Sequence, residues 1–140
     1  MQTLRVLVVD DNPHALTIVR MVLQGVGAEV RECADGRTAL DILGVWPADV
    51  VIVDYEMRPI SGAQFTRRLR AREGGARRTP VLMMTGHADR KHVSEAIESG
   101  IDGFVAKPIS TGSLLSRLEM VMEAAARKLD KPAARARRRP

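Results

Sequence analysis

The chain has 140 residues, of which 45% are hydrophobic and 28% are charged, and these values are typical of one globular domain. Its apolar runs are too short for a membrane-spanning helix, which needs roughly 18 apolar residues, and too short for a signal peptide. The single cysteine, Cys33, excludes an internal disulfide and a zinc site built from several cysteines. We therefore expect a cytoplasmic location.

The net charge of +5 is unevenly distributed along the chain. Residues 127–140 contain seven Lys or Arg and one Asp, whereas residues 1–126 contain fifteen basic and sixteen acidic residues. We predict a domain over residues 1–126, followed over residues 127–140 by the end of the last helix and a basic, disordered tail. The tail either increases solubility or attaches to an acidic partner, a membrane surface or nucleic acid.

Short apolar runs, rich in β-branched residues, alternate with segments of helical periodicity. The predicted strands cover residues 4–9, 28–33, 50–53, 81–84 and 103–106. The predicted helices end at Gly25 and before Pro47 in the first two cases, and cover residues 62–72, 88–99 and 111–127 in the other three. Strands that alternate with helices in this way predict an α/β fold of the flavodoxin-like (βα)5 type, with a parallel sheet in the order 2-1-3-4-5 and helices on both faces.

Polar side chains follow four of the predicted strands, at the edge where function collects in open α/β sheets. Asp10 and Asp11 follow the first strand, Asp54 the third, Thr85 the fourth and Lys107 the fifth. Clustered carboxylates repel one another unless a cation or proton lies among them. The pattern therefore predicts an Mg²⁺ site with oxygen ligands beside a carboxylate that can accept a phosphoryl group. Taken singly, either Asp11 or Asp54 could instead be a helix N-cap.

Four segments carry a family resemblance: VVDDN at 8–12, VDYEMRPISG at 53–62, MTGH at 84–87 and FVAKP at 104–108. Together they resemble the receiver domain of two-component response regulators, over about residues 3–125. The resemblance implies that Asp54 is the phosphoacceptor and that Lys107 pairs with the phosphoryl oxygens. It implies that Mg²⁺, for which Mn²⁺ can substitute, is held by Asp11 as a direct ligand, by Asp10 through a metal-bound water, by Asp54 and by the backbone carbonyl of Glu56. It also implies a cis peptide before Pro108.

The same resemblance assigns regulatory roles to further residues. Thr85 and Phe104 would be the switch residues, and Glu56 and His87 would occupy positions that set the lifetime of the phosphoryl group. The loop after the phosphoacceptor departs from the usual family pattern, because Arg58 intervenes before Pro59. We expect this arginine to add a cation near the mouth of the site.

The resemblance predicts a stand-alone response regulator, which a histidine kinase or a phosphotransfer protein phosphorylates and which signals by protein contact. The contact surface, for a downstream partner or a second copy, would combine helix 88–99, strand 103–106 and helix 111–127. Such a protein is not a metabolic enzyme, since it catalyses only its own Mg²⁺-dependent phosphorylation and dephosphorylation.

Three alternatives stay open: a phosphatase of the haloacid-dehalogenase type, a nucleic-acid-binding module that uses the basic tail, and a receiver that works without phosphorylation. The six arginines between positions 67 and 78 favour a solvated helix face over a nucleic-acid surface, because few aromatic residues accompany them. The three histidines are expected to face solvent.

Overall fold

The structure is a computed structural model that describes residues 3–130, except for the side chains at positions 87, 88, 129 and 130. Its elements are β1 (Arg5–Val9), α1 (Pro13–Gly25), β2 (Glu29–Cys33), α2 (Gly36–Val45), β3 (Val50–Asp54), α3 (Gly62–Ala71), the 3₁₀ helix η1 (Gly75–Arg78), β4 (Val81–Thr85), the 3₁₀ helix η2 (His87–His92), α4 (Val93–Ser99), β5 (Gly103–Ala106) and α5 (Thr111–Asp130). The strands form one parallel sheet in the order β2-β1-β3-β4-β5, so the predicted flavodoxin-like fold is confirmed.

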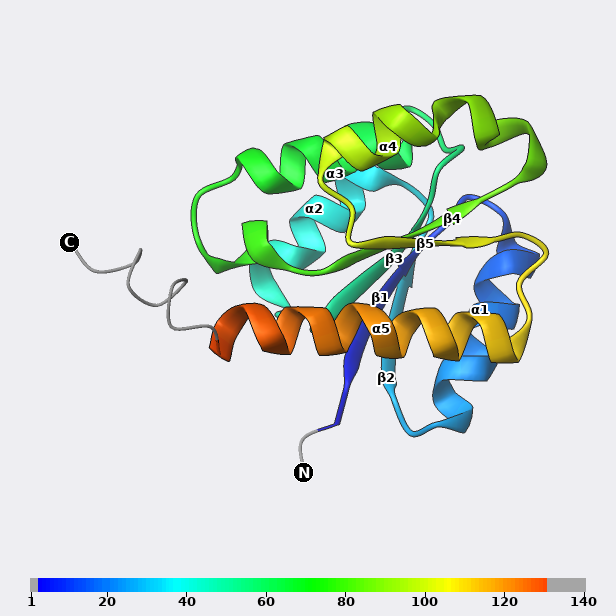
Figure 1. Cartoon of the computed structure of the whole chain (residues 1–140), viewed down its shortest axis with the longest axis horizontal. Helices are drawn as coiled ribbons and strands as arrows, with labels where there is room; N and C mark the ends of the chain where they lie inside the picture. Colours follow the sequence, from blue (N-terminus) through cyan, green and yellow to red (C-terminus); the bar gives the residue numbers. More distant parts are fainter. Residues whose placement is uncertain (1–2, 131–140) are drawn as a thin grey trace.

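Helices cover both faces of the sheet (Figure 1). One face packs against α1 and α5, and the other packs against α2, α3 and α4. Successive residues of a strand point to opposite faces, so Val6 and Val8 enter one core cluster while Leu7 and Val9 enter the other. Because all four side chains are fully buried, the run is apolar throughout rather than alternating with polar residues.

Most predicted boundaries agree with the structure to within a few residues, but one helix differs in kind. The predicted helix 88–99 is divided into η2 and the shorter α4. The carboxylate of Asp89 accepts a hydrogen bond from the backbone N–H of Gly86 at 2.8 Å, and the 3₁₀ turn begins there. Helix α5 continues to Asp130, beyond the predicted end at residue 127, and the predicted tail from residue 131 onward lies outside the described residues.

The prediction that the arginines of α3 face solvent is wrong for Arg70. Its guanidinium donates hydrogen bonds to the backbone carbonyls of Thr79 (2.6 Å), Arg77 (2.8 Å) and Gly100 (2.9 and 3.1 Å). It also forms an ion pair with Asp102 at 2.9 Å. Arg70 therefore joins α3 to η1 and to the turn between α4 and β5.

Two further side chains that were predicted to face solvent also make specific contacts. Arg72 donates a hydrogen bond to the carbonyl of Leu40, on α2. The His92 ring stacks on that of Tyr55, with the ring centroids 5.4 Å apart. Each partner is distant in sequence, so the local pattern of apolar and polar residues could not predict either contact.

Two other predictions concern backbone geometry and membranes. The peptide bond between Lys107 and Pro108 is cis, as predicted, and the bond between Arg58 and Pro59 is cis as well. Within residues 3–130, no helix has the length and apolar character required to cross a bilayer.

Candidate functional site

An open cleft lies at the carboxyl edge of the sheet, with a volume of about 340 Å³. The ends of β1, β3 and β5 bring their polar residues together there. The lining residues are Asp10, Asp11, Asn12, Asp54, Glu56, Met57, Arg58, Gly86, Asp89 and Lys107. The cleft thus brings together all three predicted aspartates and the predicted lysine.

The three aspartates can meet one cation. Asp10 is fully buried, Asp54 is 5% exposed and Asp11 lies at the surface. One carboxylate oxygen from each residue lies within 4.8 Å of the others. Oxygen ligands in such an arrangement suit Mg²⁺, which binds through one or two carboxylates and keeps several waters. The donor set therefore fits the predicted metal.

Neither Asp11 nor Asp54 is a helix cap. The side chain of Asn12 caps α1 by accepting a hydrogen bond from the N–H of His14 at 2.9 Å. Helix α3 begins at Ser61, whose hydroxyl accepts from the N–H of Gln64 at 3.1 Å. Since both helix starts have other caps, the two carboxylates need another explanation, and the cleft gives one.

Lys107 lies between two of the buried acids. Its Nζ is 2.9 Å from Oδ2 of Asp10 and 3.0 Å from Oδ1 of Asp54. Burial lowers the pKa of Lys107, but its hydrogen bonds to the two carboxylates outweigh burial, and the net shift is upward. The lysine therefore stays charged in the cleft.

The carboxyl group of Asp54 has an unusual pKa. The pKa is raised from the ordinary value of 3.8 to about 6, first by burial and then by repulsion from Asp10, although the hydrogen bond from Lys107 opposes the increase. A pKa of this size leaves the carboxylate ionised at pH 7, as a nucleophile requires. The raised pKa also shows that the ionised carboxylate of Asp54 would be stabilised by an additional positive charge in the cleft.

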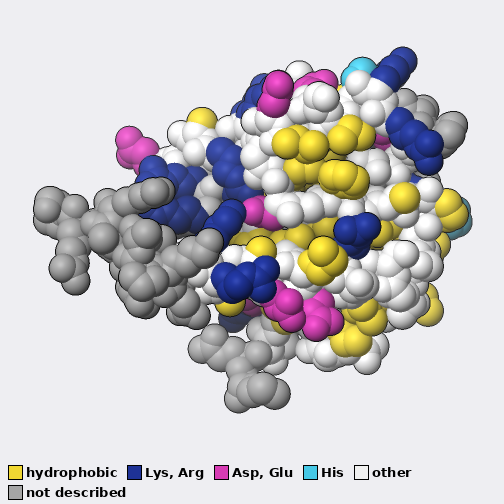
Figure 2. Space-filling view, viewed as in Figure 1, with side chains coloured by type: hydrophobic (Ala, Val, Ile, Leu, Met, Phe, Trp, Pro, Cys, Tyr) yellow, Lys and Arg dark blue, Asp and Glu magenta, His cyan; other side chains and the backbone are white. Residues whose placement is uncertain are grey.

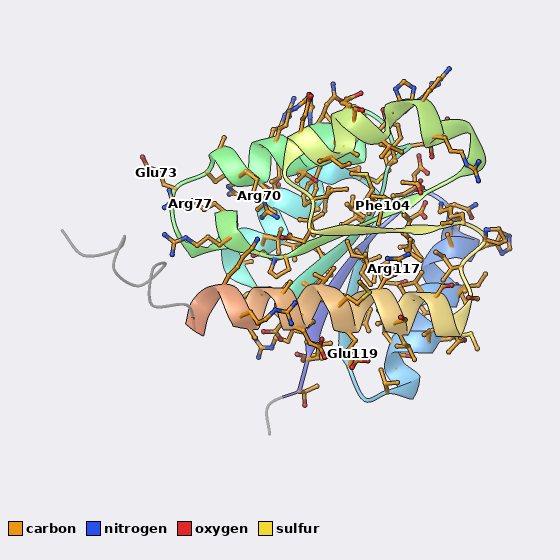
Figure 3. All side chains as sticks on the ribbon, viewed as in Figure 1. Arg70, Glu73, Arg77, Phe104, Arg117 and Glu119 are labelled. Atoms are coloured by element: carbon orange, nitrogen blue, oxygen red, sulfur yellow. The ribbon has the colours of Figure 1, made fainter. Side chains whose placement is uncertain are left out.

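The predicted switch residues occupy the neighbouring strands. Thr85 ends β4, is half-buried, and its backbone carbonyl accepts a hydrogen bond from the N–H of Lys107 at 2.8 Å. Phe104 lies on β5 and is 41% exposed (Figure 3). Of the predicted rate-tuning residues, Glu56 is exposed in the cleft, while the His87 side chain lies outside the described part of the structure.

Sequence reasoning missed one acid in the cleft. Asp89 is 7% exposed and accepts a hydrogen bond from the Gly86 N–H. Its position three residues after a glycine that follows a strand is a helix-start signal, which could have indicated a capping carboxylate. Asp89 was missed because the apolar periodicity predicted one continuous helix over residues 88–99, in which it had no special position.

Comparison with known proteins agrees with the family resemblance found in the sequence. Residues 6–119 match the family model described as the response regulator receiver domain. The chemotaxis protein CheY-3 of Vibrio cholerae is 32% identical over 123 residues, which is 87% of this chain and 94% of that protein. The solved structure of the chemotaxis response regulator CheY4 of Vibrio cholerae superposes with a TM-score of 0.78 at 32% identity, over 86% of this chain and 99% of that one.

A second similar solved structure contains a magnesium ion. The receiver domain of the sensor histidine kinase PA1611 from Pseudomonas aeruginosa, which has a magnesium ion coordinated in its active-site cleft, superposes with a TM-score of 0.79. The sequence identity is 26%, over 87% of this chain and 99% of that one.

Proposed function

This chain belongs to the receiver domain family of response regulators, and on that premise we propose that Asp54 accepts a phosphoryl group from a histidine kinase or a phosphotransfer protein. One observation carries the proposal. The carboxylate of Asp54 is buried at the base of an open cleft, where Lys107 lies 3.0 Å from its Oδ1 and two further acids are close by.

In the proposed reaction, an ionised oxygen of Asp54 attacks the phosphorus atom of a phosphohistidine. The P–N bond breaks as the new P–O bond forms, and the product is an acyl phosphate. Lys107 can form an ion pair with the added phosphoryl group, because its Nζ already contacts the carboxylate of Asp54. The hydroxyl of Thr85, at the end of the neighbouring strand, would donate to a phosphoryl oxygen.

Mg²⁺, or Mn²⁺ in its place, would be held by the carboxylates of Asp10, Asp11 and Asp54 and by the backbone carbonyl of Glu56. When bound, such an ion supplies positive charge that offsets the phosphoryl oxygens. The structure supports this set through the mutual approach of the three carboxylates and the position of Glu56 in the same cleft.

The lifetime of the phosphoryl group would depend on Glu56 and His87. Glu56 lies exposed at the rim of the cleft, where an attacking water must enter. We expect Glu56→Ala and His87→Ala to change the dephosphorylation rate severalfold while phosphorylation is retained. Equal lifetimes for both variants and the wild type would contradict these two roles.

The output would be a protein contact through α4, β5 and α5, with either a downstream partner or a second copy. Large apolar side chains are exposed on all three elements: Ile97 on α4, Phe104 on β5 and Met120 on α5. Apolar side chains also gather between α4 and α5 on the face shown in Figure 2. Exposed apolar area of this kind is typical of an interaction surface.

Incubation with acetyl phosphate and Mg²⁺, followed by intact-mass measurement, tests the proposal. We expect one added phosphoryl group in the wild type, none in Asp54→Asn, and none when the metal is chelated. Asp41→Asn removes an exposed carboxylate on α2 and serves as the matched control, which should be labelled like the wild type. Full labelling of Asp54→Asn would contradict the assignment, and many turnovers of a small phosphomonoester would favour the phosphatase alternative.

A further inference from the structure

A second charged region lies at the opposite end of the molecule from the cleft, beside the amino ends of β4 and β5. It is formed by four exposed basic residues, which we call the basic pole: Arg77 and Arg78 of η1, and Arg127 and Lys128 of α5. Figure 2 shows Lys and Arg side chains gathered at this end of the molecule, where α5 ends. The proposed phosphorylation chemistry does not use these residues.

Asp102 joins the two segments of the basic pole. Its Oδ2 is 2.9 Å from Arg70, and its Oδ1 is 3.7 Å from Nζ of Lys128. Arg70 in turn donates to the backbone carbonyl of Arg77 at 2.8 Å (Figure 3). One half-buried arginine and one aspartate therefore hold η1 and the end of α5 side by side.

The positive charge of the basic pole is only partly offset by acids. Asp102 is shared between Arg70 and Lys128, and Glu123 approaches Arg127 only at 4.0 Å. Within the described part of the chain, Arg77 and Arg78 form no ion pair, although Glu73 lies at the same end (Figure 3). Directly after α5, residues 131–140 add five Lys or Arg and no acid.

The residue types in and around the basic pole indicate which kind of polyanion it could bind. Three of its four members are arginines. The planar guanidinium group of an arginine can donate two parallel hydrogen bonds to the oxygens of one phosphate group. The aromatic residues lie elsewhere: Trp46 and Phe65 are buried, Tyr55 stacks on a histidine, and Phe104 is on β5. Single-stranded nucleic acids are usually bound by stacking bases on aromatic rings, so their recognition here is disfavoured.

A membrane surface fits the basic pole less well. Peripheral membrane segments combine basic residues with apolar side chains that enter the interface. Among the described residues, the large exposed apolar side chains are Ile18, Met21, Val26, Val45, Ile97, Phe104 and Met120. None of them lies on η1 or on residues 121–130 of α5.

We propose that the basic pole binds the phosphate backbone of double-stranded nucleic acid. Contacts to a regular phosphate backbone need cations spread over a surface and no stacking platform. The cleft lies at the carboxyl ends of the strands and the basic pole lies at their amino ends. The cleft therefore stays accessible to a phosphodonor while nucleic acid is bound. This inference goes beyond the proposed function and does not depend on it.

Fluorescence anisotropy of a labelled 20-base-pair DNA duplex, titrated with the full chain at several salt concentrations, tests this proposal. The logarithm of the binding constant should fall linearly with the logarithm of salt, with a slope of roughly −0.9 per phosphate contacted. Arg77→Gln combined with Arg78→Gln should weaken binding by about threefold to tenfold and make this slope shallower.

The matched control combines Arg37→Gln with Arg90→Gln, which removes the same charge from exposed positions outside the basic pole. It should leave the affinity within about twofold of the wild type. Equal weakening by the control pair would overturn the proposal, as would no binding at low salt, or preference for single-stranded RNA or anionic vesicles. Asp54→Asn should bind the duplex like the wild type, so failure here is distinguishable from failure of the phosphorylation proposal.

Discussion

Lys107 reaches across the end of β4 to bring its Nζ within 3.0 Å of Oδ1 of Asp54, on β3. The strand between them ends at Thr85, whose carbonyl accepts a hydrogen bond from the backbone N–H of Lys107 at 2.8 Å. The residue that would carry the phosphoryl group, the residue that would meet its charge and the proposed switch residue are therefore directly connected. A change of charge on Asp54 would affect Lys107 first and β4 next.

This contact lowers the pKa of Asp54 against the larger, opposite effect of burial. The pKa can be measured from the carboxyl ¹³C chemical shift of the metal-free protein as pH is varied. We expect a midpoint near pH 6, with the carboxylate ionised above it and protonated below it. Lys107→Gln should move the midpoint upward, because it removes the positive charge that lowers the pKa, and Mg²⁺ should move it downward. The exposed Lys91→Gln is the control and should leave it unchanged. A wild-type midpoint near the ordinary value of about 4 would contradict the environment described for Asp54.

Gly62 should tolerate no side chain. A Cβ at this position would clash with the backbone carbonyl oxygen of Asp54 and lie 3.1 Å from the Cα of Tyr55. We expect Gly62→Ala to reduce the free energy of unfolding by about 1–3 kcal/mol, the usual cost of overpacking, and to slow labelling by acetyl phosphate. Urea unfolding measures the first effect. Gly112→Ala, which meets no atom within 4 Å, should be neutral or stabilising, and equal losses in the two variants would contradict the explanation.

Arg70 should be important for stability although its residue type suggests a surface position. Arg70→Gln removes hydrogen bonds to three backbone carbonyls and the ion pair with Asp102, so we expect a loss of about 2–4 kcal/mol in urea unfolding. Arg68→Gln, at an exposed position on the same helix, should change the unfolding free energy by less than about 0.5 kcal/mol. Similar values for the two variants would show that the Arg70 contacts contribute little.

The case of Arg70 also shows where prediction from sequence ends. The strands and the acidic residues were predictable, because parallel topology places the carboxyl ends of all strands at one edge. The partners of Arg70 lie on other elements, and a local pattern reports only whether a position is polar. The division of the predicted helix 88–99 was missed for a related reason, since residue periodicity does not distinguish the 3₁₀ turn η2, whose start Asp89 caps, from the α-helix that follows it.

Thr85→Ala should separate phosphorylation from its output. The variant keeps every acid and Lys107, so labelling by acetyl phosphate should continue, but it lacks the hydroxyl that would draw β4 toward the phosphoryl group. We expect phosphorylation-dependent ¹H–¹⁵N shifts in α4, β5 and α5 of the wild type, including Phe104, and their weakening in the variant. Thr85→Ser restores a hydroxyl and should recover them. Shifts that concentrate on α1 and α2 instead would contradict the proposed switch.

The most direct test of the central proposal is to locate the phosphoryl group on the chain. After incubation with acetyl phosphate and Mg²⁺, borohydride reduces an aspartyl phosphate to homoserine, and peptide mass spectrometry then identifies the position that was modified. We expect homoserine at position 54 alone in the wild type, and at no position in Asp54→Asn. Homoserine at Asp10, Asp11 or Asp89 with none at position 54 would contradict it.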